Sequence, residues 1–109
     1  MPFDPGLAAL IRDDLSDTPR VVEKRMFGGI AFMVGGHMAA GVLGDAGIYR
    51  PGKAALAEAG ALPGVTPWLH SRRPMGGYVL AGAEAMASDA TRRRLLSLSL
   101  AHVAALPGR

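Results

Sequence analysis

The stretch GGIAFMVGGHMAAGVL, residues 28–43, decides the fold of this chain. Two short apolar runs, residues 30–34 and 38–43, flank the pair Gly35-Gly36. A two-residue hairpin turn of type I′ needs positive φ at both central positions, and glycine adopts positive φ without a steric penalty. The stretch therefore predicts two antiparallel strands joined by a tight turn, with positive φ at Gly35 or Gly36.

The segments on either side of this hairpin extend the predicted sheet. A turn at residues 44–47 leads to a third strand at residues 48–50, which makes a three-stranded meander. On the N-terminal side, residues 21–27 indicate an extended approach to the hairpin. The pair Gly28-Gly29 then joins two extended segments, which favours a bulge or sharp bend with positive φ at one of the two glycines.

Three further signals predict helices. Asp4 can cap a first helix of about twelve residues, whose apolar residues recur on one face. An alanine-rich helix is expected at residues 53–59, with Gly60 as the left-handed residue at its C-terminus. Ser88 can cap a last helix over residues 89–105.

A weak strand at residues 66–70 and a clearer one at residues 78–81 lie between the second and third predicted helices. The predicted fold is therefore of the α+β class, in the order α-β(3)-α-β(2)-α. It has two layers, an antiparallel five-stranded sheet and three helices on one of its faces. A length of 109 residues fits a single domain, so we assign residues 1–109 to one domain.

The composition excludes several classes of protein. Half of the residues are hydrophobic and 19% are charged, so the chain can form a packed core and is not intrinsically disordered. The absence of cysteine excludes disulfides, thiolate metal sites and a cysteine nucleophile. No apolar run approaches the roughly 18 residues of a membrane span, and the N-terminus carries no export signal. We therefore expect a cytoplasmic protein that does not bind membranes.

No combination of residues predicts catalysis or metal binding. The histidines His37, His70 and His102 have no metal-ligand spacing. Neither a phosphate-binding G-x-x-x-x-G-K-S/T motif nor a nucleophile motif G-x-S-x-G occurs. His102 interrupts an apolar stripe, which is typical of a core or interface histidine. We expect no catalytic residue, no cofactor and no metal.

The basic residues raise a second class of function. The net charge is +3, and the basic clusters are Arg72-Arg73 and Arg92-Arg93-Arg94. Clustered arginines can contact phosphates, so a nucleic-acid-binding module that uses these clusters is an alternative. However, three adjacent residues spread around a helix at about 100° per residue and cannot all face one groove. We therefore do not favour nucleic acid as the partner.

The apolar surface predicts self-association. The strands at residues 30–34 and 38–43 are apolar at successive positions, so both faces of the sheet need cover. Three helices on one face cannot shield the other, and we therefore expect a homodimer. The last helix adds a broader apolar face than a one-sided helix needs, formed by Leu95, Leu96, Leu98, Leu100, Val103 and Leu106.

Three segments carry a resemblance to a known family: Arg25-Met26-Phe27-Gly28-Gly29-Ile30-Ala31-Phe32, Gly41-Val42-Leu43 and Arg73-Pro74-Met75-Gly76-Gly77-Tyr78-Val79. In this order, they resemble the N-terminal domain of the TfoX/Sxy family, which is named for regulators of bacterial natural competence. The resemblance extends from about Leu7 to Leu106 and implies the fold predicted above, which is similar to secretion-chaperone folds. The regulators also have a C-terminal domain that resembles helix-hairpin-helix modules, and these 109 residues contain no such segment.

The resemblance implies a non-enzymatic regulatory or protein-interaction domain, with a regulatory protein as a partner. It brings no catalytic or cofactor residues. Two of these segments contain a motif of five residues, Arg25–Gly29 and Arg73–Gly77. Because each motif holds an arginine, a methionine and paired glycines beside a strand, we predict that the two motifs lie close together. A small-ligand binder or an unrecognised enzyme that uses the surroundings of Arg25 and Arg73 is a third alternative. The candidate interaction residues are those of the two motifs: Arg25, Met26, Phe27, Gly28, Gly29, Arg73, Pro74, Met75 and Gly77.

Overall fold

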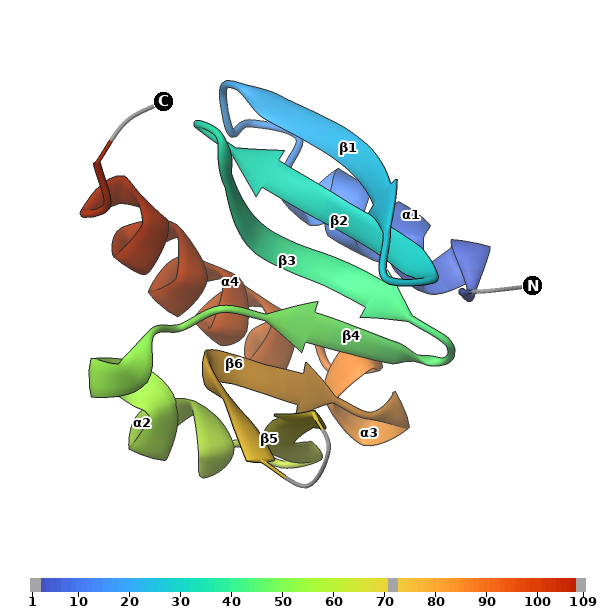
Figure 1. Cartoon of the computed structure of the whole chain (residues 1–109). Coiled ribbons are helices and arrows are strands. Elements are labelled where there is room, and N and C mark those ends of the chain that lie inside the picture. Colours follow the sequence, from blue (N-terminus) through green and yellow to red (C-terminus); the bar gives the residue numbers. More distant parts are fainter. Residues whose placement is uncertain (1–2, 71–72, 108–109) are drawn as a thin grey trace.

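The computed structural model describes residues 3–70 and 73–107. Within these residues the protein has one sheet of six strands, four α-helices and a short 3-10 helix. Neighbouring strands pair antiparallel in the order β1-β2-β3-β4-β6-β5 (Figure 1). The predicted α+β class is therefore confirmed. Along the chain the elements are α1 Pro5–Asp14, β1 Val21–Met26, β2 Gly29–Val34, β3 His37–Leu43, β4 Ala46–Tyr49, the 3-10 helix η1 Lys53–Ala55, α2 Leu56–Gly60, β5 Val65–His70, β6 Arg73–Ala81, α3 Ala83–Met86 and α4 Asp89–Ala104.

The central hairpin forms as the sequence predicts. β2 pairs with β3 across a turn in which Gly35 and Gly36 have φ values of 60° and 88°. β3 pairs in turn with β4, so the predicted meander is confirmed. The glycine pair thus fixes the register of the two central strands, because the type I′ turn leaves no freedom in loop length.

The predicted number of five strands is wrong, because residues 21–26 form a strand of their own, β1. β1 pairs with β2 along its whole length. The turn between them is Phe27-Gly28, and both residues have positive φ, 46° and 78°. The sequence hides this hairpin because a phenylalanine rarely adopts positive φ and because β1 carries three consecutive charged residues. Gly28 nevertheless has the positive φ that was predicted for Gly28 or Gly29.

The two long helices begin where the sequence predicts. The carboxylate of Asp4 accepts a hydrogen bond from the backbone N–H of Gly6 (2.7 Å) at the start of α1. The hydroxyl of Ser88 accepts one from the backbone N–H of Thr91 (3.1 Å) at the start of α4. Each cap satisfies a donor that the first helical turn leaves without a partner.

The shorter helices differ from the prediction. α3 is a fourth helix that the sequence did not predict, because four residues are too few to show a helical period. Gly60 is the last residue of α2 and not a left-handed residue after it; the positive φ falls on Gly64 (79°). No helix among the described residues is both long and apolar enough to cross a membrane.

The helices lie on one face of the sheet, which we call the covered face (Figure 1). α1 and α4 pack against β3, and α2 and α3 pack against β6. The core between these layers includes Phe32, Val42 and Leu95, whose side chains are fully buried. This arrangement confirms the two layers that the sequence predicts.

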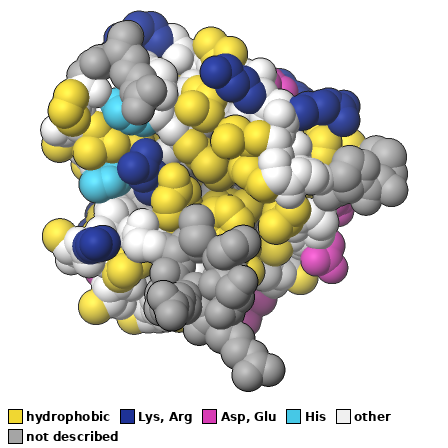
Figure 2. All heavy atoms as spheres, in the orientation of Figure 1, with side chains coloured by type: hydrophobic (Ala, Val, Ile, Leu, Met, Phe, Trp, Pro, Cys, Tyr) yellow, Lys and Arg dark blue, Asp and Glu magenta, His cyan; other side chains and the backbone are white. Residues whose placement is uncertain are grey.

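The opposite face, which we call the open face, has no helix over it in the described part of the chain. Figure 2 shows hydrophobic side chains across the middle of this face, with lysine and arginine side chains around them. Successive residues of β2 supply the two faces in turn, which explains its continuous apolar run. In β3, Met38 faces the open side and Ala40 the covered side, because the pairing with β2 shifts register between them. The open face is built from Ala31, Met38 and Ile48, with Met33, Leu43, Trp68, Tyr78 and Leu80 packed around them.

The sheet curls around its open face. β1 and β5 are its edge strands, and five spacings of about 4.8 Å would place the edges of a flat sheet roughly 24 Å apart. Yet the ring of Phe27, directly after β1, lies 5.9 Å from the ring of Trp68 in β5. Sheet twist of this strength makes the open face concave.

Candidate functional site

The first motif, RMFGG, forms the tip of the β1–β2 hairpin. Met26 and Phe27 are 43% and 38% exposed there, which is unusual for large apolar side chains. A Cβ on Gly29 would overlap the carbonyl oxygen of Val42, so this glycine allows β2 to lie close to β3. Gly28 instead serves the turn through its positive φ. The two glycines thus have different roles, and together they hold an apolar tip in place.

A row of aromatic rings connects this tip to the second motif. Phe27 meets Trp68 edge-on, with ring centroids 5.9 Å apart and an interplanar angle of 63°. Trp68 meets Tyr78 in the same way, at 5.4 Å and 73°. Tyr78 directly follows Gly77, the last glycine of the second motif. The two motifs are therefore connected through Trp68, although β1 and β6 are not neighbours in the sheet.

The second motif, RPMGG, begins β6. Gly77 has a φ of 84°, and a Cβ there would lie 3.3 Å from the Cα of Gly52. This glycine therefore lets β6 approach the loop after β4 closely. A direct contact between Met26 and Met75 stays a prediction, since the side chains described here do not include those of Arg73, Pro74 and Met75.

Arg25 points to the covered face and not to the open face. Its guanidinium lies 5.3 Å from the ring centroid of Phe3, beside an ion pair between Arg12 and Glu23 (2.6 Å). The hydrogen bonds from Arg12 lower the pKa of Glu23, and those to Glu23 raise the pKa of Arg12. The guanidinium of Arg25 therefore lies on the other side of β1 from the open face. A ligand site that uses both Arg25 and Arg73 stays a prediction, since the side chain of Arg73 lies outside the described residues.

Basic side chains lie along part of the border of the open face. Lys24 lies opposite Ala31 in the sheet and so shares the open face with it. The guanidinium of Arg50, directly after β4, lies 5.4 Å from the ring centroid of Tyr78. Among the described strands, the only carboxylate is that of Glu23, which lies on the covered face. The open face is thus an apolar surface with basic side chains on part of its border.

Both edges of the sheet are protected against the addition of another strand. β1 carries the charged residues Glu23, Lys24 and Arg25, which are exposed. In β5, Pro67 has no backbone N–H, and the pairing with β6 shifts register between Pro67 and Leu69. Charges, prolines and bulges are the usual means of preventing edge-to-edge association. The face of the sheet, and not its edges, is therefore the available surface.

Arg92 supports the fold and is buried. Its guanidinium forms ion pairs with Asp14 (2.9 Å) and Asp89 (2.7 Å), and it donates to the carbonyl oxygen of Met86 (2.8 Å). The hydrogen bond to Asp14 is the main cause that raises the pKa of Arg92. This guanidinium joins α1, α3 and α4 and is not accessible to a phosphate backbone.

The remaining arginines of the basic clusters do not form one surface with Arg92. Arg94 pairs with Glu58 of α2, and Arg93 is exposed without an ion pair to another described residue. The three adjacent arginines therefore point in different directions, as the helical spacing predicts. Phosphate contact by Arg92 to Arg94 together is incompatible with the burial of Arg92. Arg72 and the side chain of Arg73 lie outside the described residues.

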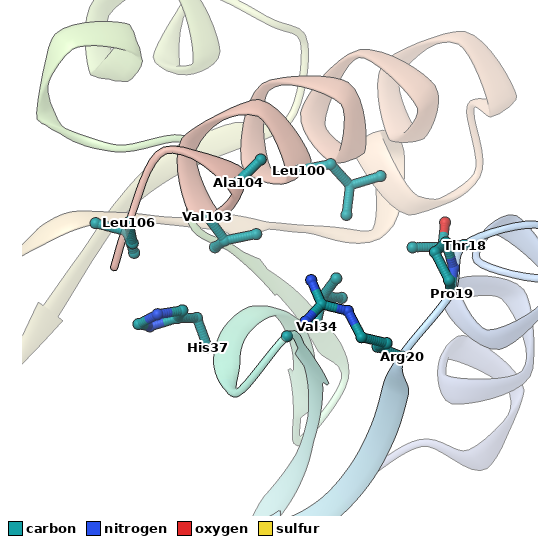
Figure 3. A pocket seen from close by; sticks show the side chains of 10 residues that line it. Thr18, Pro19, Arg20, Val34, His37, Leu100, Val103, Ala104 and Leu106 are labelled. Carbon is teal, nitrogen blue, oxygen red and sulfur yellow. The ribbon is translucent and has the colours of Figure 1, made fainter. Parts of the chain in front are cut away.

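A cavity of about 390 Å³ lies between the C-terminal half of α4 and the β2–β3 turn. Figure 3 shows the side chains of Arg20 and His37 across this cavity from Val103 of α4. Arg20 has a φ of 60°, and its guanidinium lies against Gly35. His37 donates from Nε2 to the carbonyl oxygen of Pro107 (2.6 Å). The cavity has mostly apolar walls, with its basic groups on one side.

The described side chains form no group of three histidine, aspartate or glutamate residues that could hold a metal ion. His37 is fixed to the C-terminal segment, and His102 lies against the loop after β4. The side chain of His70 lies outside the described residues. The candidate binding surfaces of the described residues are therefore the apolar open face and the cavities lined by basic side chains.

These observations define a class of protein: a two-layer α+β domain with helices on one face of a curled sheet and an apolar surface on the other. A family model of the TfoX N-terminal domain matches residues 13–103. The chain therefore belongs to the TfoX N-terminal domain family, which is not a known enzyme family. No curated protein and no solved structure matched the chain in the comparisons.

Three residues of the open face were not singled out in the sequence. Met33 belongs to a continuous apolar run, which does not show the face of the sheet on which each side chain lies. In the structure, Phe32 lies on the covered face and its neighbour Met33 on the open face. Trp68 follows Pro67 in a weak predicted strand, which gives no sign of its face. It is the single tryptophan of the chain, and this alone could have marked it as a candidate interface residue. Arg50 precedes a Pro-Gly pair, and this pattern indicates only that a strand ends there.

Proposed function

We propose that this protein is a non-enzymatic interaction domain whose binding surface is the open face of the sheet. The observation that carries this function is the exposure of Val22, Met26 and Phe27 at the border of a face without a covering helix, next to the partly buried side chains of that face. Aromatic residues and methionine are enriched at protein interfaces, and they supply half of the residues of this face: Met33, Met38, Trp68 and Tyr78. Burying a side chain of the size of Met26 or Phe27 contributes about 1.5–3 kcal/mol.

The occupant that we propose is a second copy of the chain. A two-fold interface uses the same patch on both copies, and an apolar patch can pack against a second copy of itself. Val22 and Met26 stand out of one border of the concave face, being 54% and 43% exposed. In a two-fold pair, this border of each copy would fill the concave centre of the other, while Lys24 and Arg50 stay hydrated.

The family supports a role in regulation, because TfoX N-terminal domains are named after competence regulators. A dimer would present two identical covered faces outward, and a regulatory protein would bind the assembled pair. We infer that this interaction takes place in the cytoplasm.

Sedimentation equilibrium at micromolar concentration tests the proposed function. We expect the wild-type protein to sediment as a dimer and Met26→Lys as a monomer, because the substitution places a charge on the open face. Leu10→Lys is the matched control, since Leu10 is similarly exposed (37%) but lies on α1, away from the open face. A wild-type monomer, or a dimer that only Leu10→Lys disrupts, would show that the open face is not the interface.

A further inference from the structure

A second cavity, of about 610 Å³, lies where β6 diverges from the end of β4. It is bounded by the loop after β4, the glycines of the second motif and the C-terminal half of α4. Arg50, Lys53 and His102 line it, and its other walls are mainly apolar, from Pro51, Ala54, Ala55, Leu98, Ala101 and Leu106. We call it the basic pocket.

Backbone hydrogen bonds hold the loop at the entrance of the basic pocket. The N–H of Arg50 donates to the carbonyl oxygen of Ala39 (3.1 Å) and to the hydroxyl of Ser99 (3.0 Å), which is fully buried. The N–H of Gly52 donates to the carbonyl oxygen of Gly77 (3.1 Å). The loop therefore has a fixed position between the sheet and α4 before any ligand arrives.

Two glycines create the room that the basic groups need. Gly52 has a φ of 89°, and a Cβ there would overlap the imidazole of His102. A Cβ on Gly76 would lie 3.0 Å from the Cε of Lys53. His102 therefore lies directly against the backbone of Gly52, and Lys53 against that of Gly76. A larger residue at either glycine would displace the basic side chain beside it.

The charge of the basic pocket is not neutralised within the described protein. None of its lining residues is an aspartate or a glutamate. The ion pairs of the described residues are made by Arg12, Arg92 and Arg94, and neither Arg50 nor Lys53 takes part. Burial, and then the nearby charges of Arg50 and His37, lower the pKa of His102. Unpaired cations beside apolar walls leave a strong preference for an anion.

We propose that the basic pocket binds a small organic anion, in which a carboxylate or phosphate group is attached to an apolar body. Ligand pockets of a few hundred Å³ combine mostly apolar walls with a small number of polar groups that fix orientation. The guanidinium of Arg50 can hold an oxyanion through two parallel hydrogen bonds, and Lys53 adds a compact charge. The apolar walls contributed by Leu98 and Leu106 would contact the body of the ligand.

The cavity of Figure 3 is a weaker candidate for the same ligand. Its permanent charge is that of Arg20 alone, whereas the basic pocket has both Arg50 and Lys53, and its histidine is already bonded to Pro107. It therefore serves as an internal comparison, because both cavities share Leu106 and can be observed in one experiment.

Amide NMR titrations of the full chain test this site with four probes: phenyl phosphate, phenylacetate, inorganic phosphate and benzyl alcohol. We expect phenyl phosphate and phenylacetate to shift the amides of Arg50, Gly52, Lys53, Gly76, Gly77 and His102 in a saturable way. The ratio of their two dissociation constants shows which oxyanion the site prefers. Inorganic phosphate should bind more weakly and benzyl alcohol most weakly, since each lacks one half of the recognised chemistry. Anion binding should also raise the pKa of His102, because a negative charge beside it favours the imidazolium.

Two variants separate a specific site from general attraction of anions. Lys53→Gln should weaken the binding of phenyl phosphate about tenfold, since one charge-assisted hydrogen bond is lost. Arg93→Gln removes an exposed arginine elsewhere on α4 and should leave the affinity unchanged. Equal weakening by both variants, shifts centred on Arg20 and Val34, or no saturable shift with any anion would overturn the site. Met26→Lys should leave anion binding unchanged, so a failure of this site is distinguishable from a failure of the dimer.

Discussion

The two faces of the sheet are built from adjacent residues of the same strands but have opposite surroundings. In β2, Phe32 lies fully buried beneath the helices, whereas its neighbour Met33 lies half-buried on the open face. A continuous apolar run usually indicates a strand that the protein itself covers on both sides. Here helices cover one side only. The difference teaches that the apolar residues on the other side form a smaller cluster, which is buried at its centre by neighbouring side chains and partly exposed around it.

Substitution of the two neighbours in β2 should break this comparison most strongly. Phe32→Ala should lower the free energy of unfolding by about 3–5 kcal/mol, because it leaves a cavity in the covered core. Met33→Ala should lower it by only about 1 kcal/mol, since that side chain is partly hydrated already. Urea denaturation at low protein concentration measures both. Similar losses in the two variants would mean that the open face is a second core and not a surface.

The buried guanidinium of Arg92 should have the next largest effect. Arg92→Ala should lower the free energy of unfolding by about 3 kcal/mol, because Asp14 would lose its partner in a poorly hydrated position. Arg93→Ala, at the next and exposed position of α4, should change it by less than about 0.5 kcal/mol. Thermal or urea unfolding of the two variants measures this difference. A comparable loss of stability in Arg93→Ala would contradict a structural role that belongs to Arg92 and not to Arg93.

The two glycines of the first motif should differ in a smaller but measurable way. Gly28→Ala should cost about 1 kcal/mol, because its positive φ is unfavourable for alanine although its surroundings are open. Gly29→Ala should cost more, about 2 kcal/mol, because the new methyl group would push β2 away from Val42. Unfolding midpoints of both variants measure the difference. If Gly28→Ala were the more damaging, close packing would not be the reason for Gly29.

The smallest expected effect is the pH dependence of His102. Its folded pKa lies below the ordinary value of 6.5, because of burial and the charges of Arg50 and His37, and Lys53 lines the same pocket. The unfolded chain therefore binds more protons as the pH falls through 6.5 towards the folded pKa. Stability should fall with acidification in this window, and His102→Gln should remove that part of the fall. An unchanged pH profile in His102→Gln would contradict the placement of this imidazole.

Features of the fold that depend on local chemistry were predictable. The Gly35-Gly36 turn and the caps at Asp4 and Ser88 each follow from a few adjacent residues. β1 was not predictable, because its turn places Phe27 at positive φ, and its strand residues gain their conformation from β2. The curl of the sheet is likewise a property of the whole assembly and leaves no pattern in any one segment.

The candidate site was predictable only in part. The first motif singled out Met26 and Phe27 as candidate interaction residues, but it predicted neither their exposure nor the turn of Arg25 to the other face. The burial of Arg92 escapes a reading of adjacent residues, since its carboxylate partner Asp14 lies far away in the sequence. The basic pocket is assembled from three separate segments, so that no spacing in the sequence announces it.

The fluorescence of Trp68 tests the central claim most directly, because it is the single tryptophan of the chain and lies in the open face. If a second copy covers this face, dilution from micromolar to nanomolar concentration should shift the emission to longer wavelength as the ring becomes hydrated. Met26→Lys should show the long-wavelength emission already at micromolar concentration, and Leu10→Lys should behave as the wild type. An emission maximum that is the same in the wild type and in Met26→Lys at every concentration would contradict the open face as the interaction surface.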